Sequence, residues 1–144
     1  REIVVRDGVA FIAAQDGGVH FVDVNDDKAA VAEVGEAIDV ILDDQDHAPE
    51  TILVCTTSSA MRDRLIDEYA FVRWETRGER EIVCENIHRT KGLEFDHVVV
   101  VTCDAELSDE LLYVGASRAV MSLTVIAPTS ITTRLGLEGT GRSG

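Results

Sequence analysis

Cysteine, proline and tryptophan are scarce in this 144-residue sequence, which contains three, two and one of them. Cys55, Cys84 and Cys103 are far apart, odd in number and without a C-x-x-C pair, which disfavours both a disulfide scaffold and a zinc site. Buried reduced thiols in a reducing cytosol fit better. No apolar run is long enough to cross a bilayer, and residues 1–8 are charged and lead into no signal peptide. We therefore expect a cytoplasmic protein with no membrane partner.

Positive charge is also scarce, because 13 Lys and Arg residues face 27 Asp and Glu residues and the net charge is −14. This balance argues against a domain whose whole surface grips nucleic acid. Residues 1–50 hold 13 of the acids against three basic residues, whereas residues 51–144 hold 14 acids against ten basic residues. A phosphate-facing surface should therefore be local and lie in the second part. The acidic first part fits a solvated face better than an interaction tail.

Three kinds of catalytic motif are missing as well. The sequence has no Gly-Lys dipeptide, so it cannot contain a P-loop. It has no Gly-x-Ser-x-Gly motif, and His20, His47 and His97 show no metal-ligand spacing. Asp104 follows an apolar strand, as a magnesium-binding aspartate would, but no P-loop accompanies it. We therefore expect no metal site in this chain.

Strand-like and helix-like segments alternate along the sequence. Strands are expected at 19–24, 51–55, 71–74, 81–86, 98–101 and 122–127, and helices at 29–42, at 60–69 and within 107–120. This alternation predicts an α/β fold, a parallel sheet with helices on both faces, whose ligands lie at the carboxyl ends of the strands. We expect a single domain over residues 1–135 and a mobile tail over 136–144. Because the chain begins with Arg rather than Met, we also expect it to be a piece of a longer protein.

Residues 88–96 read His-Arg-Thr-Lys-Gly-Leu-Glu-Phe-Asp. Lys91 and Gly92 provide a cation and a backbone that a phosphate can approach closely, and Glu94 can accept hydrogen bonds from a ribose hydroxyl. His88 and Arg89 are suited to contacting a nucleic-acid backbone. On composition alone, a surface hairpin of mixed charge that leads into a core strand explains the segment better.

Residues 112–119 read Leu-Tyr-Val-Gly-Ala-Ser-Arg-Ala and place small residues directly before Arg118. Small residues leave room for another surface to approach, and an arginine held there can stabilise charge on a transferring phosphoryl group. The alternative is a helical arginine in a surface ion pair, which taken alone is the better explanation.

A third segment follows the strand expected at 51–55. Its hydroxyls at Thr57 and Ser58, together with backbone amides at a helix start, suit an anion such as a DNA phosphate. Simple helix capping by Ser58 or Ser59 explains them equally well.

The first two segments together resemble the fifth and sixth helicase motifs of the UvrD/Rep group of superfamily 1. Family members carry Thr/Ser-x-His-x-small-Lys-Gly-Leu-Glu-aromatic-Asp, which matches His88 and the residues from Thr90 to Asp96 and departs at Asn86. They also carry Leu-Tyr-Val-Ala-Leu/Ala-Thr-Arg-Ala, where this chain has Ser117 in place of Thr. The connection between residues 69 and 82 is short, as in compact helicase-IV-like or RecD-like members.

The resemblance implies the second RecA-like domain of a helicase, a P-loop NTPase-type fold without its own P-loop. It further implies the C-terminal motor domain of an ATP-dependent DNA helicase or translocase, an ATP hydrolase in its full-length form. ATP with Mg²⁺ would be bound mainly by an N-terminal RecA-like domain of the same polypeptide, and single-stranded DNA would be the track, with RNA not excluded.

Site roles follow from the same resemblance. Arg118 is the expected catalytic residue, and the ATP-binding group is Lys91, Gly92, Glu94 and Arg118. The nucleic-acid-binding group is Thr57, Ser58, His88 and Arg89. Two alternatives remain open: a helicase-like binding module without motor activity, and an unrelated parallel α/β domain whose motifs are accidental.

Overall fold

A computed structural model provides the structure of the chain. It describes residues 2–6, 9–13, 18–43, 48–104, 108, 114 and 118–134, with side chains from His20 to Ile131 within those ranges. The predicted tail at 136–144 lies outside the described residues, as does most of the helix expected within 107–120.

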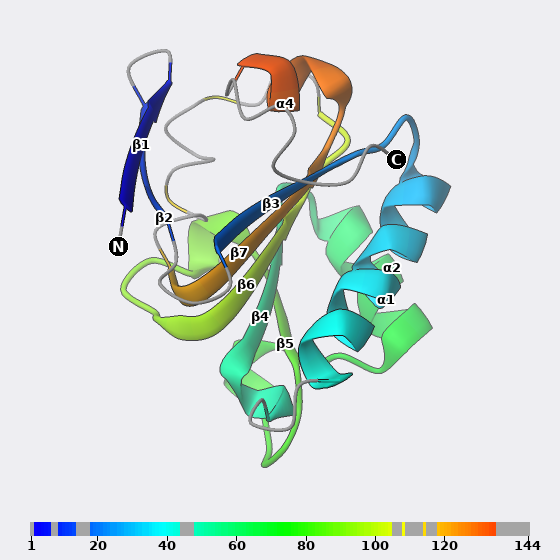
Figure 1. Ribbon diagram of the computed structural model, residues 1–144. Helices are drawn as coiled ribbons and strands as arrows, with labels where there is room; N and C mark the ends of the chain where they lie inside the picture. The colour runs from blue at the N-terminus through cyan, green and yellow to red at the C-terminus, as the bar shows by residue number, and fades with distance from the viewer. Residues whose placement is uncertain are drawn as a thin grey trace.

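The centre of the molecule is a five-stranded, all-parallel sheet with the strand order β3-β7-β6-β4-β5 (Figure 1). Its strands are β3 (Gly18–Asp23), β4 (Ile52–Thr56), β5 (Val83–Asn86), β6 (Phe95–Val101) and β7 (Ala119–Ala127). The four consecutive valines at 98–101 form most of the middle strand β6 and are fully buried, because neighbouring strands and layers on both faces exclude water. The predicted parallel α/β fold is confirmed.

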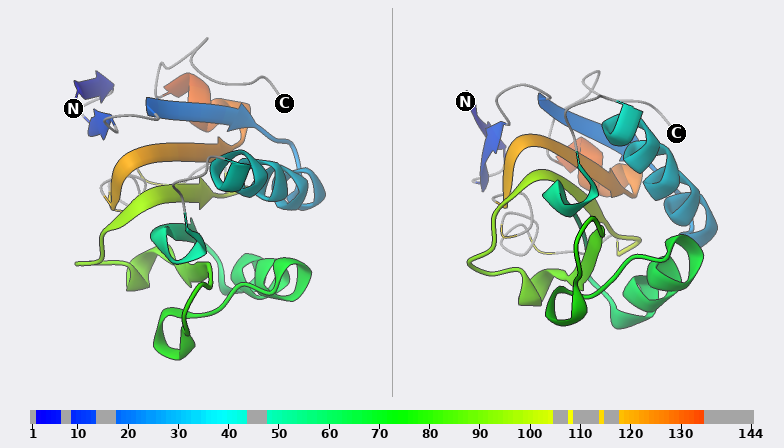
Figure 2. Two further views of the ribbon diagram at one scale, coloured as in Figure 1. Left: turned by 60° about the horizontal axis from the view of Figure 1, so that its bottom comes forward. Right: turned by 90° about the horizontal axis from the view of Figure 1, so that it is seen from below.

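Two long helices cover one face of the sheet, α1 (Asp27–Asp43) and α2 (Ser59–Tyr69) (Figure 2). Helix α1 packs over β6 and β7, and α2 packs over β4 and β5. Each helix starts at a side-chain cap, since Asp26 Oδ1 accepts from Ala29 N at 2.8 Å and Ser58 Oγ accepts from Met61 N at 3.0 Å. The caps therefore fix where each helix begins above the sheet.

The opposite face is covered by shorter elements, which include helix α4 (Thr129–Arg134) and the 3₁₀ helices η2 (Trp74–Thr76) and η3 (Ile87–Arg89). Ile131 of α4 and Ile87 of η3 are fully buried against the sheet residues of this face. The remaining 3₁₀ helix, η1 (Pro49–Thr51), leads into β4. Helices on both faces were predicted, and this expectation is confirmed.

Two expectations about individual elements fail. The strand expected at 71–74 is only a single bridge between Val72 and Val83, because Trp74 N donates to the Glu85 side chain and the chain turns into η2. The helix expected within 107–120 cannot reach its predicted end, because sheet pairing in β7 already begins at Ala119. The sequence also gave no indication of the antiparallel hairpin of β1 (Glu2–Arg6) and β2 (Val9–Ala13), a separate two-stranded sheet.

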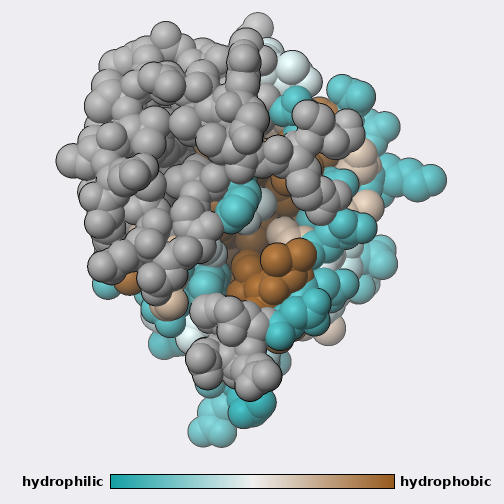
Figure 3. All heavy atoms as spheres, viewed as in Figure 1, coloured by the Kyte–Doolittle hydropathy of each residue, from teal (hydrophilic) through white to brown (hydrophobic). Residues whose placement is uncertain are grey.

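The outer side of the helical layer is polar. On the face drawn in Figure 3, hydrophilic side chains cover the side on which α1 lies, and hydrophobic ones gather nearer the centre. Among the described residues, no helix combines the length and the apolar character that a membrane span needs.

Candidate functional site

The loop that carries the first motif crosses from one end of the sheet to the other. It leaves the carboxyl end of β5 as η3 and enters the amino end of β6 at Phe95. Asn86 caps η3 by accepting from His88 N at 3.1 Å, and the buried Thr90 donates its hydroxyl to Ile87 O at 2.8 Å. Asn86, where the helicase pattern has Thr or Ser, therefore supplies the local cap that either hydroxyl residue could supply.

Arg118 lies directly against this loop. Its carbonyl accepts from Phe95 N at 2.9 Å, and its Nη1 donates to Thr90 O at 3.4 Å. Burial raises the pKa of the Cys55 thiol, and the positive charge of Arg118 opposes that rise. The two motifs, remote in sequence, thus meet at the start of adjacent strands, with Glu94 next to the bond that joins them.

The rest of the predicted nucleotide group faces solvent on the same loop. Lys91, Gly92 and Glu94 are exposed, whereas Arg118 is half-buried. Gly92 has φ +82°, a left-handed conformation that disfavours side chains, and a Cβ at this position would meet no atom within 4 Å. The glycine therefore leaves open space beside an exposed carboxylate and an exposed cation.

The position of this group corrects one expectation. Ligand-binding residues were predicted at the carboxyl ends of the strands. Glu94 and Arg118 lie instead at the amino ends, immediately before β6 and β7. The reason is that every connection between parallel strands returns to the end where the next strand begins, and Glu94 and Arg118 are the last residues of two such connections.

The predicted nucleic-acid group does lie at the carboxyl ends. Thr56 at the end of β4 pairs in register with Asn86 at the end of β5. Thr57 and Ser58, which follow β4, and His88 and Arg89, which follow β5, therefore leave the sheet at the same end. These four residues therefore gather at the end of the sheet opposite to Glu94 and Arg118.

Three members of that group already have partners within the chain. Ser58 caps α2, which confirms the capping interpretation, and Thr57 Oγ1 lies 3.0 Å from Thr102 Oγ1. Arg89 Nη1 lies 2.6 Å from Glu75 Oε1 in an exposed ion pair. The side chain of His88 is exposed, and its backbone N–H binds Asn86. A phosphate arriving at this edge would thus meet capped and paired groups.

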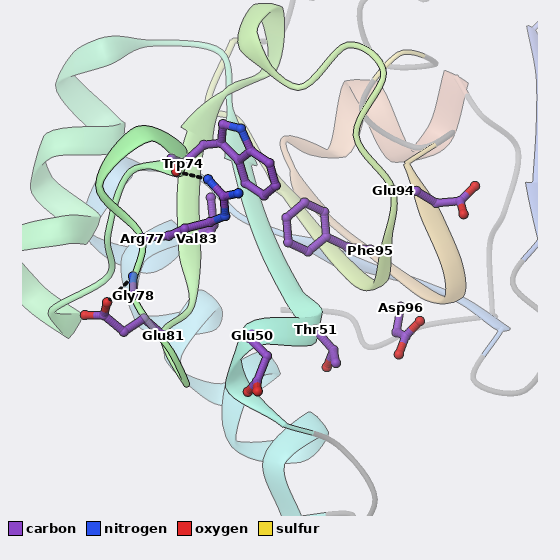
Figure 4. Close-up of a pocket in the computed structure, with 10 residues that line it drawn as sticks. All are labelled: Glu50, Thr51, Trp74, Arg77, Gly78, Glu81, Val83, Glu94, Phe95 and Asp96. Atoms are coloured by element: carbon purple, nitrogen blue, oxygen red, sulfur yellow. Dashed lines mark hydrogen bonds between the residues drawn. The ribbon is translucent and has the colours of Figure 1, made fainter.

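A pocket that sequence reasoning missed opens at the amino ends of β4, β5 and β6, with a volume of about 350 Å³ (Figure 4). Trp74 forms its aromatic wall, packed edge-on against Phe95 at 5.9 Å between ring centroids, and Arg77 stacks 3.3 Å from the indole centroid. Glu94 borders the pocket, but its side chain points away from Trp74 (Figure 4).

The thiols are far from reactive. Cys55 and Cys84 are buried and free, and burial raises the pKa of Cys84 to about 12. Cys103 is half-buried, and its pKa is raised by desolvation and by the hydrogen bond that its thiol donates to the Asp27 carboxylate. Within the described ranges, no three His, Cys, Asp or Glu residues are grouped to hold a metal ion.

Comparisons with known proteins agree with the placement of the motifs. A family model described as UvrD-like helicase C-terminal domain matches residues 81–126, the span from β5 to β7. The fold is similar to the crystal structure of the C-terminal domain of a possible DNA helicase from Lactobacillus plantarum WCFS1. That similarity has a TM-score of 0.67 and 23% identity, and it covers 90% of this chain and 86% of the other.

A search of curated proteins finds no match to this sequence. The family match contains both segments discussed above, the loop with Gly92 and Glu94 and the turn with Arg118. The structural similarity shows a shared fold over most of the chain. Residues 81–126 are therefore similar to the UvrD-like helicase C-terminal domain family, and they lie in a parallel α/β domain whose fold is shared with the C-terminal domain of a possible DNA helicase.

Proposed function

We propose that this chain is the C-terminal motor domain of an ATP-dependent DNA helicase or translocase. It would complete an ATP site together with an N-terminal RecA-like domain of the same polypeptide, in an intracellular hydrolase. The observation that carries this proposal is the hydrogen bond from Phe95 N to Arg118 O, 2.9 Å long, which joins the two motif segments beside Glu94. Residues 1–135 would act as one domain in this assembly.

The amino edge of the sheet, meaning the end at which its parallel strands begin, offers half of a nucleotide site. Glu94 would accept hydrogen bonds from the ribose hydroxyls, and Gly92 and Lys91 would let the nucleotide approach the loop. Arg118 would reach the γ-phosphate, where a fixed guanidinium stabilises the charge that develops during phosphoryl transfer. Open space at Gly92 and the exposed Glu94 carboxylate fit this role.

The chain lacks the other half. A triphosphate needs a cradle of backbone amides with a lysine, and its Mg²⁺ needs a hydroxyl and carboxylates nearby. Without a Gly-Lys step, this sequence cannot build that cradle. Mg²⁺ and most of the triphosphate would therefore be held by the N-terminal domain, and this chain alone should hydrolyse ATP poorly.

The carboxyl edge would face single-stranded nucleic acid, with DNA as the expected track. Thr57, Ser58, His88 and Arg89 would contact backbone phosphates. The loop 87–94 begins at this edge and ends at the nucleotide edge, so one short segment would connect the two ligands. A change in the bound nucleotide would then alter the contacts with nucleic acid through that loop.

The test is Arg118→Ala in a polypeptide that joins this domain to its N-terminal partner. We expect nucleic-acid-stimulated ATP hydrolysis to be lost while ATP binding largely survives, because the guanidinium acts on the transition state. Arg64→Ala, an exposed arginine on α2, is the matched control. Unchanged turnover in Arg118→Ala, with normal folding, would contradict the motor role and favour a binding module.

A further inference from the structure

The short segment η2 is fixed to the sheet by a buried carboxylate. Glu85 of β5 is 1% exposed, and its Oε2 accepts from Trp74 N at 3.0 Å and lies 3.4 Å from Arg73 Nε. The Trp74 ring also packs against Phe95. Backbone and side chain of the same residue are thus both anchored, and the next residue along the chain is held in place relative to β5.

That next residue is Glu75, and its carboxylate forms an ion pair with Arg89. Glu75 Oε1 lies 2.6 Å from Arg89 Nη1, and the two side chains are 64% and 54% exposed. Arg89 itself is fixed by η3, whose cap and buried Ile87 attach it to the end of β5. Two separately anchored 3₁₀ helices therefore bring an acid and a base together at the carboxyl edge.

A carboxylate and a phosphate offer an arginine the same kind of acceptor. Both present oxygens that bind the planar guanidinium in its fork geometry. Under the proposed function, Arg89 is a contact for a backbone phosphate of nucleic acid. The same guanidinium cannot keep its short bond to Glu75 and also give that N–H to a phosphate.

We propose that Glu75 is an internal competitor for the nucleic-acid phosphate that Arg89 binds. This inference rests on the proposed function and names a residue that tunes the affinity of that site. Without nucleic acid, Glu75 neutralises Arg89. When a phosphate arrives, Arg89 exchanges the carboxylate for the phosphate, and Glu75, held back by η2, is left to the solvent.

The exchange is readily reversible because the pair is exposed. An ion pair in this setting changes an equilibrium by a factor of about two to five. Glu75 would therefore lower affinity and its dependence on salt without blocking the site. Salt weakens the pair of Arg89 with Glu75 as well as the contact of Arg89 with the phosphate, so the two effects partly offset each other. In the absence of Glu75 this offset is lost, and the affinity falls more steeply with salt.

The experiment measures binding of a fluorescent oligothymidylate to the two-domain polypeptide by anisotropy, from low to moderate NaCl. Glu75→Gln should tighten binding about two- to fivefold at low salt and steepen the salt slope. The matched control is Glu79→Gln, which removes the same charge from an exposed neighbour in the same connection. Arg89→Ala should weaken binding, and Glu75→Gln should give no gain when added to Arg89→Ala.

The outcomes distinguish a failure of the competition by Glu75 from a failure of the nucleic-acid role of Arg89. If Arg89→Ala weakens binding but Glu75→Gln has no effect or weakens it, the competition is overturned and the nucleic-acid role of Arg89 stands. An equal gain in Glu79→Gln also overturns the competition, since it would reflect only net charge. If Arg89→Ala binds as tightly as the parent, the proposed nucleic-acid role of Arg89 fails, and the competition fails with it.

Discussion

Gly92→Ala distinguishes the role of the 87–94 loop in stability from its role in nucleotide binding. Gly92 adopts φ +82° in the turn between Thr90 and Leu93, where Leu93 N donates to Thr90 O at 3.0 Å. A Cβ added here would meet no heavy atom within 4 Å. The substitution therefore introduces backbone strain but no collision within the domain, and its effect on stability can be worked out from the backbone alone.

Two opposing contributions set the change in the free energy of unfolding. Placing an L-residue in the left-handed region costs about 1–2 kcal/mol. Replacing glycine reduces the entropy of the unfolded chain, which stabilises the fold by about 0.4–1 kcal/mol. The free energy of unfolding should therefore fall by about 1 kcal/mol. Asn tolerates this conformation better than Ala, so Gly92→Asn should cost less.

Urea denaturation of the domain measures the effect of the substitution on stability. Nucleotide titration of the two-domain polypeptide measures its effect on nucleotide binding. Under the proposed function, a side chain at residue 92 fills space that the nucleotide uses. Gly92→Ala and Gly92→Asn should then both weaken nucleotide binding, although Asn restores most of the stability. A loss of more than about 3 kcal/mol in Gly92→Ala would show that the site is crowded, and full nucleotide affinity in both variants would refute the role of the open space.

Three further predictions concern a cap, a carboxylate and a thiol. Ser58→Ala should lower the free energy of unfolding by about 1 kcal/mol and Ser58→Asp should restore it, since Oγ caps α2; equal urea midpoints would contradict this. Glu94→Ala should weaken nucleotide affinity about tenfold, with Asp96→Ala as control, and equal affinity in a titration removes the ribose role. Because burial raises the pKa of Cys84 from 9.0 to about 12, the contribution of this thiol to the free energy of unfolding is full below pH 9 and falls as pH rises toward 12, by at most about 1.4 kcal/mol per pH unit. Cys84→Ala should flatten that decline, and an unchanged pH profile would contradict the shift.

Much of the fold follows from local signals in the sequence. Asp26 and Ser58 are placed where a side chain can cap a helix, and both helices begin next to them. The four consecutive valines at 98–101 are typical of a strand that is covered on both faces, because such strands are nearly continuous in apolar residues. These features depend on neighbours in sequence, so they were visible before the structure.

The failures depend on contacts between remote residues. Trp74 leaves the strand predicted at 71–74 because the Glu85 carboxylate accepts its N–H, and no local pattern reveals that pairing. The contact of Arg118 with the first motif follows from the hydrogen bonds to Phe95 and Thr90, which form only once β6 and β7 are adjacent. The sequence motifs indicated which residues matter, and the sheet topology decided where they lie.

The central claim is that Glu94 and Arg118 serve one nucleotide at the amino edge of the sheet. A crystal structure of the two-domain polypeptide with Mg²⁺ and a non-hydrolysable ATP analogue tests it most directly. We predict the ribose hydroxyls within hydrogen-bonding distance of the Glu94 carboxylate and the γ-phosphate within reach of the Arg118 guanidinium. A bound nucleotide that touches neither side chain would contradict the account.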